Sequence, residues 1–407
     1  MLNIFKLKSM SLCINPQCKQ QHNSDSTIFC NSCGSELLID GRYRVVGELG
    51  HGGFGTAYEV LDFNYHPWVL KVLTDNHPKY VELFRQEAEI LSTLSHSGIP
   101  KIDLDGYFTY FPEEREEPLH CLVMEKIEGL DLAEYIKKRG NRPIKFKRAL
   151  RWLAELTLIL ERVHQHNFFH RDIKPSNIML KANGCLVLID FGTVREVTQS
   201  YINKKAAGDI TGVVSHGYTP IEQMKGKAVF QSDFYALGGT MIFLLTAQNP
   251  SSFYNFSDDK FYWHSSATDI PSQFVDLIDR MTAFSPAKRP ATAREIFNQA
   301  VAIDSSLQIL DEHNASTTQT RLDSAYSYRS HLTEATVTPL QQSSPVTPEF
   351  IEHCRLELAE YIGPMASIIC KRTVRENPNI SQTELCMALA KTISNPQQAK
   401  DFQRRLV

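Results

Sequence analysis

The spacing of hydrophobic and polar positions divides the chain into four stretches. Residues 1–39 are mostly polar, whereas residues 40–301 carry regular apolar patterns. Residues 302–346 are rich in Ser, Thr and Gln and contain almost no apolar clusters, which is typical of a flexible linker. Residues 347–407 return to helical periodicity. We therefore expect an N-terminal segment, a large folded domain, a linker and a small helical module, divided at these positions.

In the large domain, strand-like runs come before helical ones. Apolar runs of strand length occupy Tyr43–Leu49, Trp68–Leu73 and Leu119–Met124. Amphipathic runs of helical length follow at Lys147–His166 and Phe234–Thr246. The pattern predicts a β-rich first part and a helical second part.

Composition and charge exclude several classes of protein. The 407 residues include 43 Lys and Arg against 46 Asp and Glu, a net charge of −3. A near-neutral chain is a poor candidate for a general nucleic-acid binder, because phosphate contacts need an excess of cations. No apolar run approaches the roughly 20 residues that cross a bilayer. The first residues, MLNIFKLKSMSLC, contain neither a sustained apolar stretch nor a small-residue cleavage site, so we do not expect secretion. We expect a cytoplasmic protein with no membrane span and no nucleic-acid partner.

Four of the nine cysteines lie in the first 33 residues. Cys13, Cys18, Cys30 and Cys33 follow the pattern C-x4-C-x11-C-x2-C, the spacing of a small zinc ribbon, and thiolates bind Zn²⁺ strongly. Four protein ligands close the site, so we expect a structural zinc ion. Two alternatives stay open: four unrelated thiols, or His22 in place of one cysteine. The other cysteines are scattered singly, and we expect them to be small buried hydrophobes.

A glycine-rich segment, LGHGGFG at Leu49–Gly55, joins two strand-like runs. Its G-x-G-x-x-G spacing also occurs in dinucleotide-binding folds, but there a helix follows the glycines. Here the strand-like Thr56–Val60 follows instead. Glycine lets backbone amides approach phosphate oxygens closely, so the segment predicts a loop over phosphates. The alternative is an ordinary glycine-rich hairpin.

A lysine and a glutamate extend this half of the site. Lys71 lies in an apolar strand, where an ammonium group needs a partner. Glu87 lies in a helical pattern and could supply the carboxylate that holds Lys71 against the α- and β-phosphates. Glu89 is the alternative partner, and the order of the helical positions favours Glu87.

Further charged motifs follow the first long helix. Residues His170–Asn177 read HRDIKPSN, and a short strand then leads to Asp190–Gly192, which reads DFG. With these residues the chain resembles the protein kinases. The glycine loop, the Lys–Glu pair and both motifs occur in the family order over about 260 residues. The resemblance implies an α+β, two-lobed fold with a small β-rich N-lobe and a larger helical C-lobe.

The chemistry of phosphoryl transfer explains these residue types. Asp172 can accept the proton of a substrate hydroxyl, and Lys174 can place a positive charge near the transferred group. Asn177 and Asp190 supply the oxygen ligands that Mg²⁺, or Mn²⁺, prefers beside the phosphates of ATP. The resemblance implies that Met124 is the gatekeeper of the adenine pocket. The residues carried over for binding ATP are Leu49, Gly50, Gly52, Gly53, Phe54, Gly55, Ala57, Val69, Lys71, Met124, Glu125, Ile127 and Met179.

Supporting residues are also carried over from the family. The resemblance implies that Glu222 pairs with Arg289 and that Asp233 caps the backbone of the HRD loop. Ser215 replaces the threonine that bridges Asp172 to the lysine in serine/threonine-specific members, and it keeps the hydroxyl group.

The two appended segments point to one group within the family. The chain resembles bacterial eukaryotic-like serine/threonine kinases that carry an N-terminal zinc ribbon directly before the kinase fold. The run Leu385–Ile393 in the C-terminal zone is amphipathic. With Ile362–Ala366 as its recognisable core, this zone resembles a small all-α module of bacterial signalling proteins. We expect this module to bind a protein partner or a signal, and a homodimer stays an open alternative.

The sequence therefore predicts an ATP-dependent serine/threonine protein kinase in bacterial signal transduction, acting on protein substrates and on itself. The alternative is a pseudokinase, which binds nucleotide or a partner without transferring phosphate. Pseudokinases usually lose the counterparts of Lys71, Asp172 or Asp190, and all three are present here.

Overall fold

The computed structural model describes most of the chain in two compact units, Met1–Tyr328 and Arg329–Val407. The residues that it describes are 10–51, 55–113, 115–191, 195–196, 215–255, 257–267, 269–311, 348–362, 366, 369–370, 373–374, 377, 380–390, 393 and 396–406. Gly52, Gly53 and Phe54 of the glycine loop lie outside them. Among the described residues, no helix is both long enough and apolar enough to cross a membrane.

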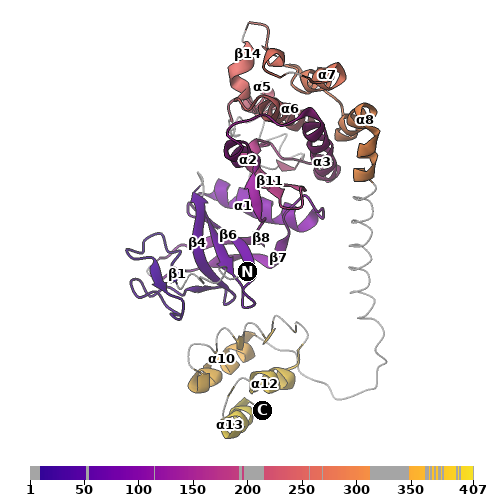
Figure 1. Ribbon diagram of the computed structural model, residues 1–407. Helices are drawn as coiled ribbons and strands as arrows, with labels where there is room; N and C mark the ends of the chain where they lie inside the picture. The colour runs from indigo at the N-terminus through magenta and orange to yellow at the C-terminus, as the bar shows by residue number, and fades with distance from the viewer. Residues whose placement is uncertain are drawn as a thin grey trace, which may run out of the picture. The chain divides into compact units, whose positions relative to one another are not determined.

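The first unit contains a β-rich lobe and a helical lobe (Figure 1). The β-rich lobe is an antiparallel sheet of six strands in the order β3-β4-β5-β6-β8-β7. Its elements are β3 (Leu38–Ile39), β4 (Tyr43–His51), β5 (Gly55–Leu61), β6 (Pro67–Leu73), helix α1 (Pro78–Thr93), β7 (Ile102–Tyr110) and β8 (Leu119–Glu125). The three strands predicted from apolar runs are β4, β6 and β8, within two residues at either end.

The sheet is buried on both faces, as the alternation along β8 shows. Leu122 and Met124 point into the core shared with α1 and the helical lobe. Cys121 and Val123 point to the opposite face, into a second core. Because side chains alternate between faces along a strand, a continuous apolar run such as β8 fits a strand that is covered on both sides.

The N-terminal segment covers the outer face of this sheet. Its strands β1 (Met10–Leu12) and β2 (His22–Ser24) form a hairpin, and Ile14 is buried in the same core as Val60 and Leu70 of the sheet. Polar contacts add to the packing: the Asn15 side chain donates to the carbonyl of Glu113 at 3.2 Å, in the loop between β7 and β8. The expected boundary at residue 39 therefore lies inside one packed structure, and β3 belongs to both.

The helical lobe is built around α3, whose buried face is almost wholly apolar. A small antiparallel sheet of β9, β11 and β12 lies near the junction with the β-rich lobe. The elements are β9 (Gly129–Asp131), α2 (Leu132–Lys138), α3 (Phe146–Gln165), β10 (Phe168–Phe169), β11 (Ile178–Lys181), β12 (Leu186–Leu188), β13 (Arg195–Glu196), α5 (Ile221–Met224), α6 (Phe230–Thr246), β14 (Tyr254–Asn255), β15 (Lys260–Phe261), α7 (Ser272–Met281) and α8 (Ala293–Ile303).

Helix α6 begins four residues before the predicted run at Phe234. Its first turn contains the polar residues Gln231, Ser232 and Asp233. A prediction based on apolar residues therefore places the start of the helix too late. The Ser232 hydroxyl accepts a hydrogen bond from the Val229 amide at 3.1 Å, which satisfies a donor at the helix N-terminus.

The second unit is helical, with α10 (Pro348–Ile362), α12 (Gln382–Ala390) and α13 (Pro396–Leu406). Its core is a separate apolar cluster in which Leu358, Leu385 and Phe402 are fully buried. The described part of the predicted amphipathic run Leu385–Ile393 falls on the end of α12, up to Ala390, and Ile393 is buried in the same core.

Candidate active site

A cavity of about 800 Å³ lies between the two lobes of the first unit. The β-rich lobe supplies the apolar walls, and the loops after α3 and β12 supply polar groups. Every described residue that was predicted to bind ATP lines it: Leu49, Gly50, Gly55, Ala57, Val69, Lys71, Met124, Glu125, Ile127 and Met179. Asp172, Asn177 and Asp190 line the same cavity from the helical lobe.

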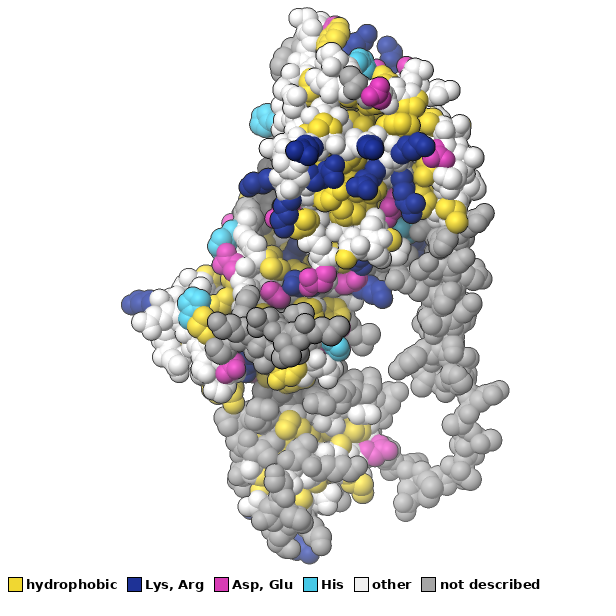
Figure 2. Space-filling view, viewed as in Figure 1, with side chains coloured by type: hydrophobic (Ala, Val, Ile, Leu, Met, Phe, Trp, Pro, Cys, Tyr) yellow, Lys and Arg dark blue, Asp and Glu magenta, His cyan; other side chains and the backbone are white. Residues whose placement is uncertain are grey.

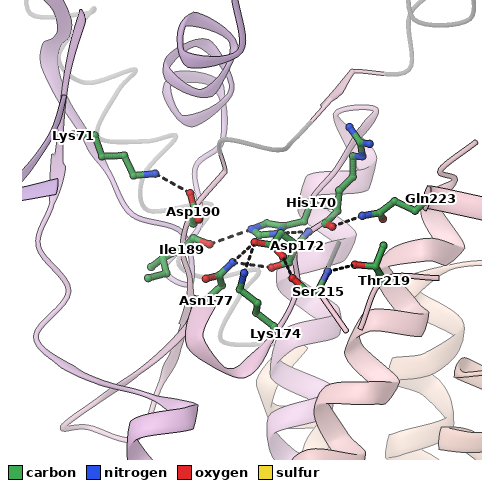
Figure 3. Close-up of polar contacts among 11 residues, drawn as sticks. Lys71, His170, Asp172, Lys174, Asn177, Ile189, Asp190, Ser215, Thr219 and Gln223 are labelled. Carbon is green, nitrogen blue, oxygen red and sulfur yellow. Dashed lines mark hydrogen bonds and ion pairs between the residues drawn. The ribbon is translucent and has the colours of Figure 1, made fainter. Parts of the chain in front are cut away.

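Lys71 connects the two lobes. Its Nζ lies 2.5 Å from Oε1 of Glu87 on α1 and 3.0 Å from Oδ1 of Asp190, and Figure 3 shows it extended toward Asp190. Glu87 is buried, whereas Glu89 is exposed on the other side of the helix. The structure thus pairs Lys71 with Glu87, the partner favoured by the sequence.

Charge and burial act against each other at this triad. Burial disfavours the ammonium form of Lys71, but Asp190 and Glu87 outweigh it and hold the pKa of Lys71 above its ordinary value. Lys71 in turn lowers the pKa of Asp190 to about 2. Burial raises the pKa of Glu87, although Lys71 opposes the rise. The charge of Lys71 therefore favours the ionised form of Asp190 and opposes the effect of burial on Glu87.

Asp172 is held by three side chains (Figure 3). Ser215 Oγ donates to its Oδ1 at 2.9 Å, while Lys174 Nζ at 2.8 Å and Asn177 Nδ2 at 2.9 Å donate to its Oδ2. Asp172 is only 6% exposed, so these donors fix the direction of its carboxylate. Lys174 reaches the site through this contact and does not itself line the cavity.

Asp233 of α6 holds the backbone of the HRD loop, residues His170–Asn177. This fully buried carboxylate accepts hydrogen bonds from the amides of His170 and Arg171, both at 2.8 Å, and from Nε2 of His164 at 2.9 Å. Arg171 has φ of 70°, a left-handed conformation that costs roughly 1–3 kcal/mol for a residue with a side chain. Asp233 and Gln223, which donates to the Arg171 carbonyl at 2.6 Å, stabilise that conformation.

A buried ion pair fixes the segment after Ser215. Arg289 donates to both carboxylate oxygens of Glu222, at 2.6 and 3.2 Å, and its side chain is completely buried. Ser232 donates to the same carboxylate at 2.8 Å. This pair joins α5 to the loop before α8, as the family resemblance implied.

Sequence reasoning missed three supporting side chains: His164, Gln223 and Thr219, whose hydroxyl accepts from the Ser215 amide at 2.7 Å. They are ordinary polar residues in helices and loops. No local signal in the sequence marks them.

The oxygen donors of the site fit a magnesium ion. Mg²⁺ prefers carboxylate and amide oxygens together with phosphate. Asn177 uses its amide nitrogen to bind Asp172, and no donor in the described part of the chain bonds to its amide oxygen. Asn177 and Asp190 line the same cavity, so that they could hold the ion together.

The four N-terminal cysteines lie close together, with all Sγ atoms within 4.8 Å of one another. Cys13 and Cys33 are 3.6 Å apart, and Cys18 and Cys30 are 3.5 Å apart. Zn–S bonds of about 2.3 Å in a tetrahedron place sulfur atoms about 3.8 Å apart, so the cluster fits Zn²⁺. His22 does not join the described cluster. Burial opposes the thiolate, yet backbone amides of Cys33 and Ser32 lower the pKa of Cys30 to about 6.

The cavity, the charged triad and the aspartate of the HRD loop are those of one class of protein. The protein kinase domain family matches residues 43–301, and the chain belongs to this family. A second family, described only as a domain of unknown function (DUF8082), matches residues 349–407.

Curated relatives come from cyanobacteria, among other bacteria. Serine/threonine-protein kinase F of Synechocystis sp. is 34% identical over 314 residues, which are 70% of this chain and 62% of the relative. Serine/threonine-protein kinase PknA of Nostoc sp. is 37% identical over 275 residues, 64% of this chain and 47% of the relative. The chain thus spans about half to three fifths of the length of these relatives. The kinase domain of Mycobacterium tuberculosis PknI is a solved structure with 22% identity and a TM-score of 0.49, covering 63% of this chain and 94% of that one.

Proposed function

We propose that the protein transfers the γ-phosphate of ATP to serine and threonine hydroxyls of proteins, including its own. One observation carries the proposal: Asp172, held by three donors, faces the same cavity as the Lys71–Asp190 pair. A nucleotide in the cavity would lie between a fixed positive charge and a proton acceptor. The names of the bacterial relatives support the same activity.

Each residue of the chain then has a defined task. Lys71, fixed by Glu87, places its charge where the α- and β-phosphates lie, and Asp172 accepts the proton of the substrate hydroxyl as the phosphate is transferred. Lys174, bonded to Asp172, adds positive charge beside the transferred group. Asp190 and Asn177 would hold Mg²⁺, which neutralises phosphate charge when it is bound.

The preference for serine and threonine is supported by Ser215. Its hydroxyl bonds to Asp172 at 2.9 Å, which is half of the bridge expected from the family. In the described residues Lys174 is bonded to Asp172 itself, so the two donors meet on one carboxylate.

The activity can be tested with labelled ATP and Mg²⁺. We expect the full chain to incorporate phosphate, and acid hydrolysis to release phosphoserine or phosphothreonine. Asp172→Asn should abolish incorporation without lowering the melting temperature by more than a few degrees. A wild-type protein that binds ATP but incorporates no phosphate into itself or a general acceptor would instead establish the pseudokinase.

We also propose a structural zinc ion on Cys13, Cys18, Cys30 and Cys33. The sulfur distances support it, and four protein ligands leave no position for chemistry. Metal analysis of freshly purified, reduced protein should return about one zinc per chain. Protein without zinc that keeps its full stability would contradict the proposal.

For the second unit we propose a role in binding a protein partner. Its described residues form a closed apolar core without a cluster of catalytic side chains, which suits an interaction module. We further propose a cytoplasmic location. None of the nine cysteines, all of which the structure describes, is in a disulfide, as expected in a reducing compartment.

A further inference from the structure

A second cavity, of about 1250 Å³, lies on the helical lobe away from the ATP site. The N-terminal part of α3, the end of α2 and the turn between β11 and β12 line it. Six cations surround it: Arg139, Lys145, Lys147, Arg148, Arg151 and Lys181. We call this cavity the basic groove. Figure 2 shows Lys and Arg side chains gathered in a band over α2 and α3, with hydrophobic side chains between them.

The charge of this surface is concentrated and unbalanced. Eight of the fifteen residues from 137 to 151 are Lys or Arg, and none is Asp or Glu. All eight are exposed. Within the described residues, no ion pair engages any of these eight, and only Lys181 of the groove has an acidic partner, Glu125 at 3.4 Å. In a chain of net charge −3, such a surface attracts anions strongly.

Tyr135 holds two of the arginines of the groove in place. The Tyr135 hydroxyl accepts a hydrogen bond from Arg148 at 2.7 Å, and the Arg139 guanidinium lies 5.5 Å from the centre of the Tyr135 ring. Tyr135 packs edge-on against Trp152, which is buried. Arg139 and Arg148 are therefore positioned before any ligand arrives, which reduces the entropy that these two side chains lose on binding.

The groove also has apolar walls. Trp152, Leu158 and Leu310 line it between the cations. Glu155 is the one acidic side chain among the described lining residues, and it accepts a hydrogen bond from the Leu186 amide at 2.6 Å. Burial raises the pKa of Glu155, and the hydrogen bond from Leu186 and the charge of Arg151 oppose the rise. One carboxylate faces six cations, so the groove keeps an excess of positive charge.

We propose that the basic groove binds an acidic peptide segment of a partner protein, with apolar side chains between its Asp and Glu residues. Alternating cations and apolar walls suit such a chain. Its carboxylates can pair with the cations at the rim, and its apolar side chains can move out of water and into the groove. A concave site of this size fits an extended peptide better than a flat membrane or a rigid DNA duplex. The proposal does not depend on phosphotransfer, because none of the groove cations lines the ATP cavity.

The test measures binding of a fluorescent peptide in which Asp alternates with Leu, by anisotropy on the full chain. Lys147→Glu with Arg148→Glu should weaken binding about ten-fold or more. Both positions lie in the first turn of α3, where acidic residues are favourable to the helix, so the fold should persist. The matched control, Lys260→Glu with Lys288→Glu, makes the same charge change on exposed residues elsewhere and should alter affinity by less than about two-fold.

Further binding measurements distinguish an acidic peptide from other ligands of the groove. A peptide with Ser in place of Leu should bind several-fold more weakly, because it loses the apolar contacts. The proposal is overturned if the groove variant binds like wild type, if the control variant loses as much affinity, or if a DNA duplex or anionic phosphatidylglycerol vesicle binds more tightly than the peptide. If Lys147→Glu with Arg148→Glu melts early, Arg139→Ser with Lys145→Ser replaces it, with the same expected loss.

Discussion

At the scale of single residues, the central feature is Lys71 between two carboxylates. Glu87 fixes the ammonium from α1, and Asp190 receives it from the helical lobe. The charge of Lys71 therefore has two roles. It faces the proposed nucleotide site, and it offsets the repulsion between the carboxylates of Glu87 and Asp190. Removing that charge affects activity and stability in separable ways.

Lys71→Met should lower phosphate incorporation about 100-fold or more, because a charge aimed at the phosphates is lost. The measurement is the initial rate with labelled ATP. Glu89→Gln is the matched control: this carboxylate is exposed on the same helix and should leave the rate within about two-fold of wild type. A rate in Lys71→Met near that of the control would contradict the role of Lys71.

The stability effect of Lys71→Met should depend on pH. Asp190 has a pKa of about 2 in the folded chain instead of 3.8, so its ionised form stabilises the fold above about pH 4, and this contribution is lost as the pH falls toward 2. Without Lys71, the stabilisation from ionised Asp190 is lost at neutral pH, and the carboxylates of Asp190 and Glu87 repel each other. Protonation in acid removes this repulsion. We expect the difference in unfolding free energy between wild type and variant to be largest at neutral pH and to shrink on acidification. Urea unfolding across this pH range would show it, and a constant difference would contradict it.

At the scale of elements, buried polar contacts hold the loops that flank the site. Asp233 connects α6 to the HRD loop, and the Glu222–Arg289 pair connects α5 to the loop before α8. These contacts join positions that lie 62 to 67 residues apart in sequence. Through Glu222, the short helix α5 is bonded both to Ser232 of α6 and to Arg289.

Arg289→Met should destabilise the helical lobe by about 3–5 kcal/mol, because it leaves Glu222 without its counter-charge in a poorly solvated place. Thermal unfolding of the full chain measures the loss. The double variant Glu222→Gln with Arg289→Met should recover part of it, since no unpaired charge remains. Equal losses in the single and double variants would show that packing of Arg289, and not its charge, matters.

The sequence was a good guide to motifs that are contiguous in the chain and a poor guide to residues that meet only in three dimensions. Apolar runs marked β4, β6, β8 and α3, because period and length distinguish a buried strand from a long amphipathic helix. His164 and Gln223 carry no such mark, since their roles depend on which loop backbone lies beside them. The basic groove was likewise hidden, because the net charge of −3 averages a local excess over the whole chain.

At the scale of the whole molecule, the cysteine cluster is tied to the β-rich lobe. Cys33 Sγ lies 3.2 Å from the Ser35 hydroxyl, and that hydroxyl accepts a hydrogen bond from the Glu113 amide at 3.0 Å. The Tyr110 hydroxyl also donates to the Glu36 carbonyl at 2.7 Å. Loss of the proposed zinc should therefore destabilise the sheet of the β-rich lobe.

A zinc chelator should lower the melting temperature of the full chain and increase binding of a hydrophobic dye, because the covered face of the sheet becomes accessible. Cys30→Ser should reproduce both effects without chelator. Cys185→Ser is the control, since this cysteine is exposed and outside the cluster, and it should change neither measurement. Identical behaviour of the two variants would contradict a zinc-dependent cover.

The position of β3 has a practical consequence for anyone who trims the chain to its protein kinase domain. A fragment that starts at residue 40 would lack the edge strand Leu38–Ile39 and the side chain of Ile14. It would present an unpaired strand edge along β4 and an exposed hydrophobic surface over Val60 and Leu70, both of which favour self-association. Fragments for crystallisation or enzymology are better begun before the hairpin, at or ahead of Met10.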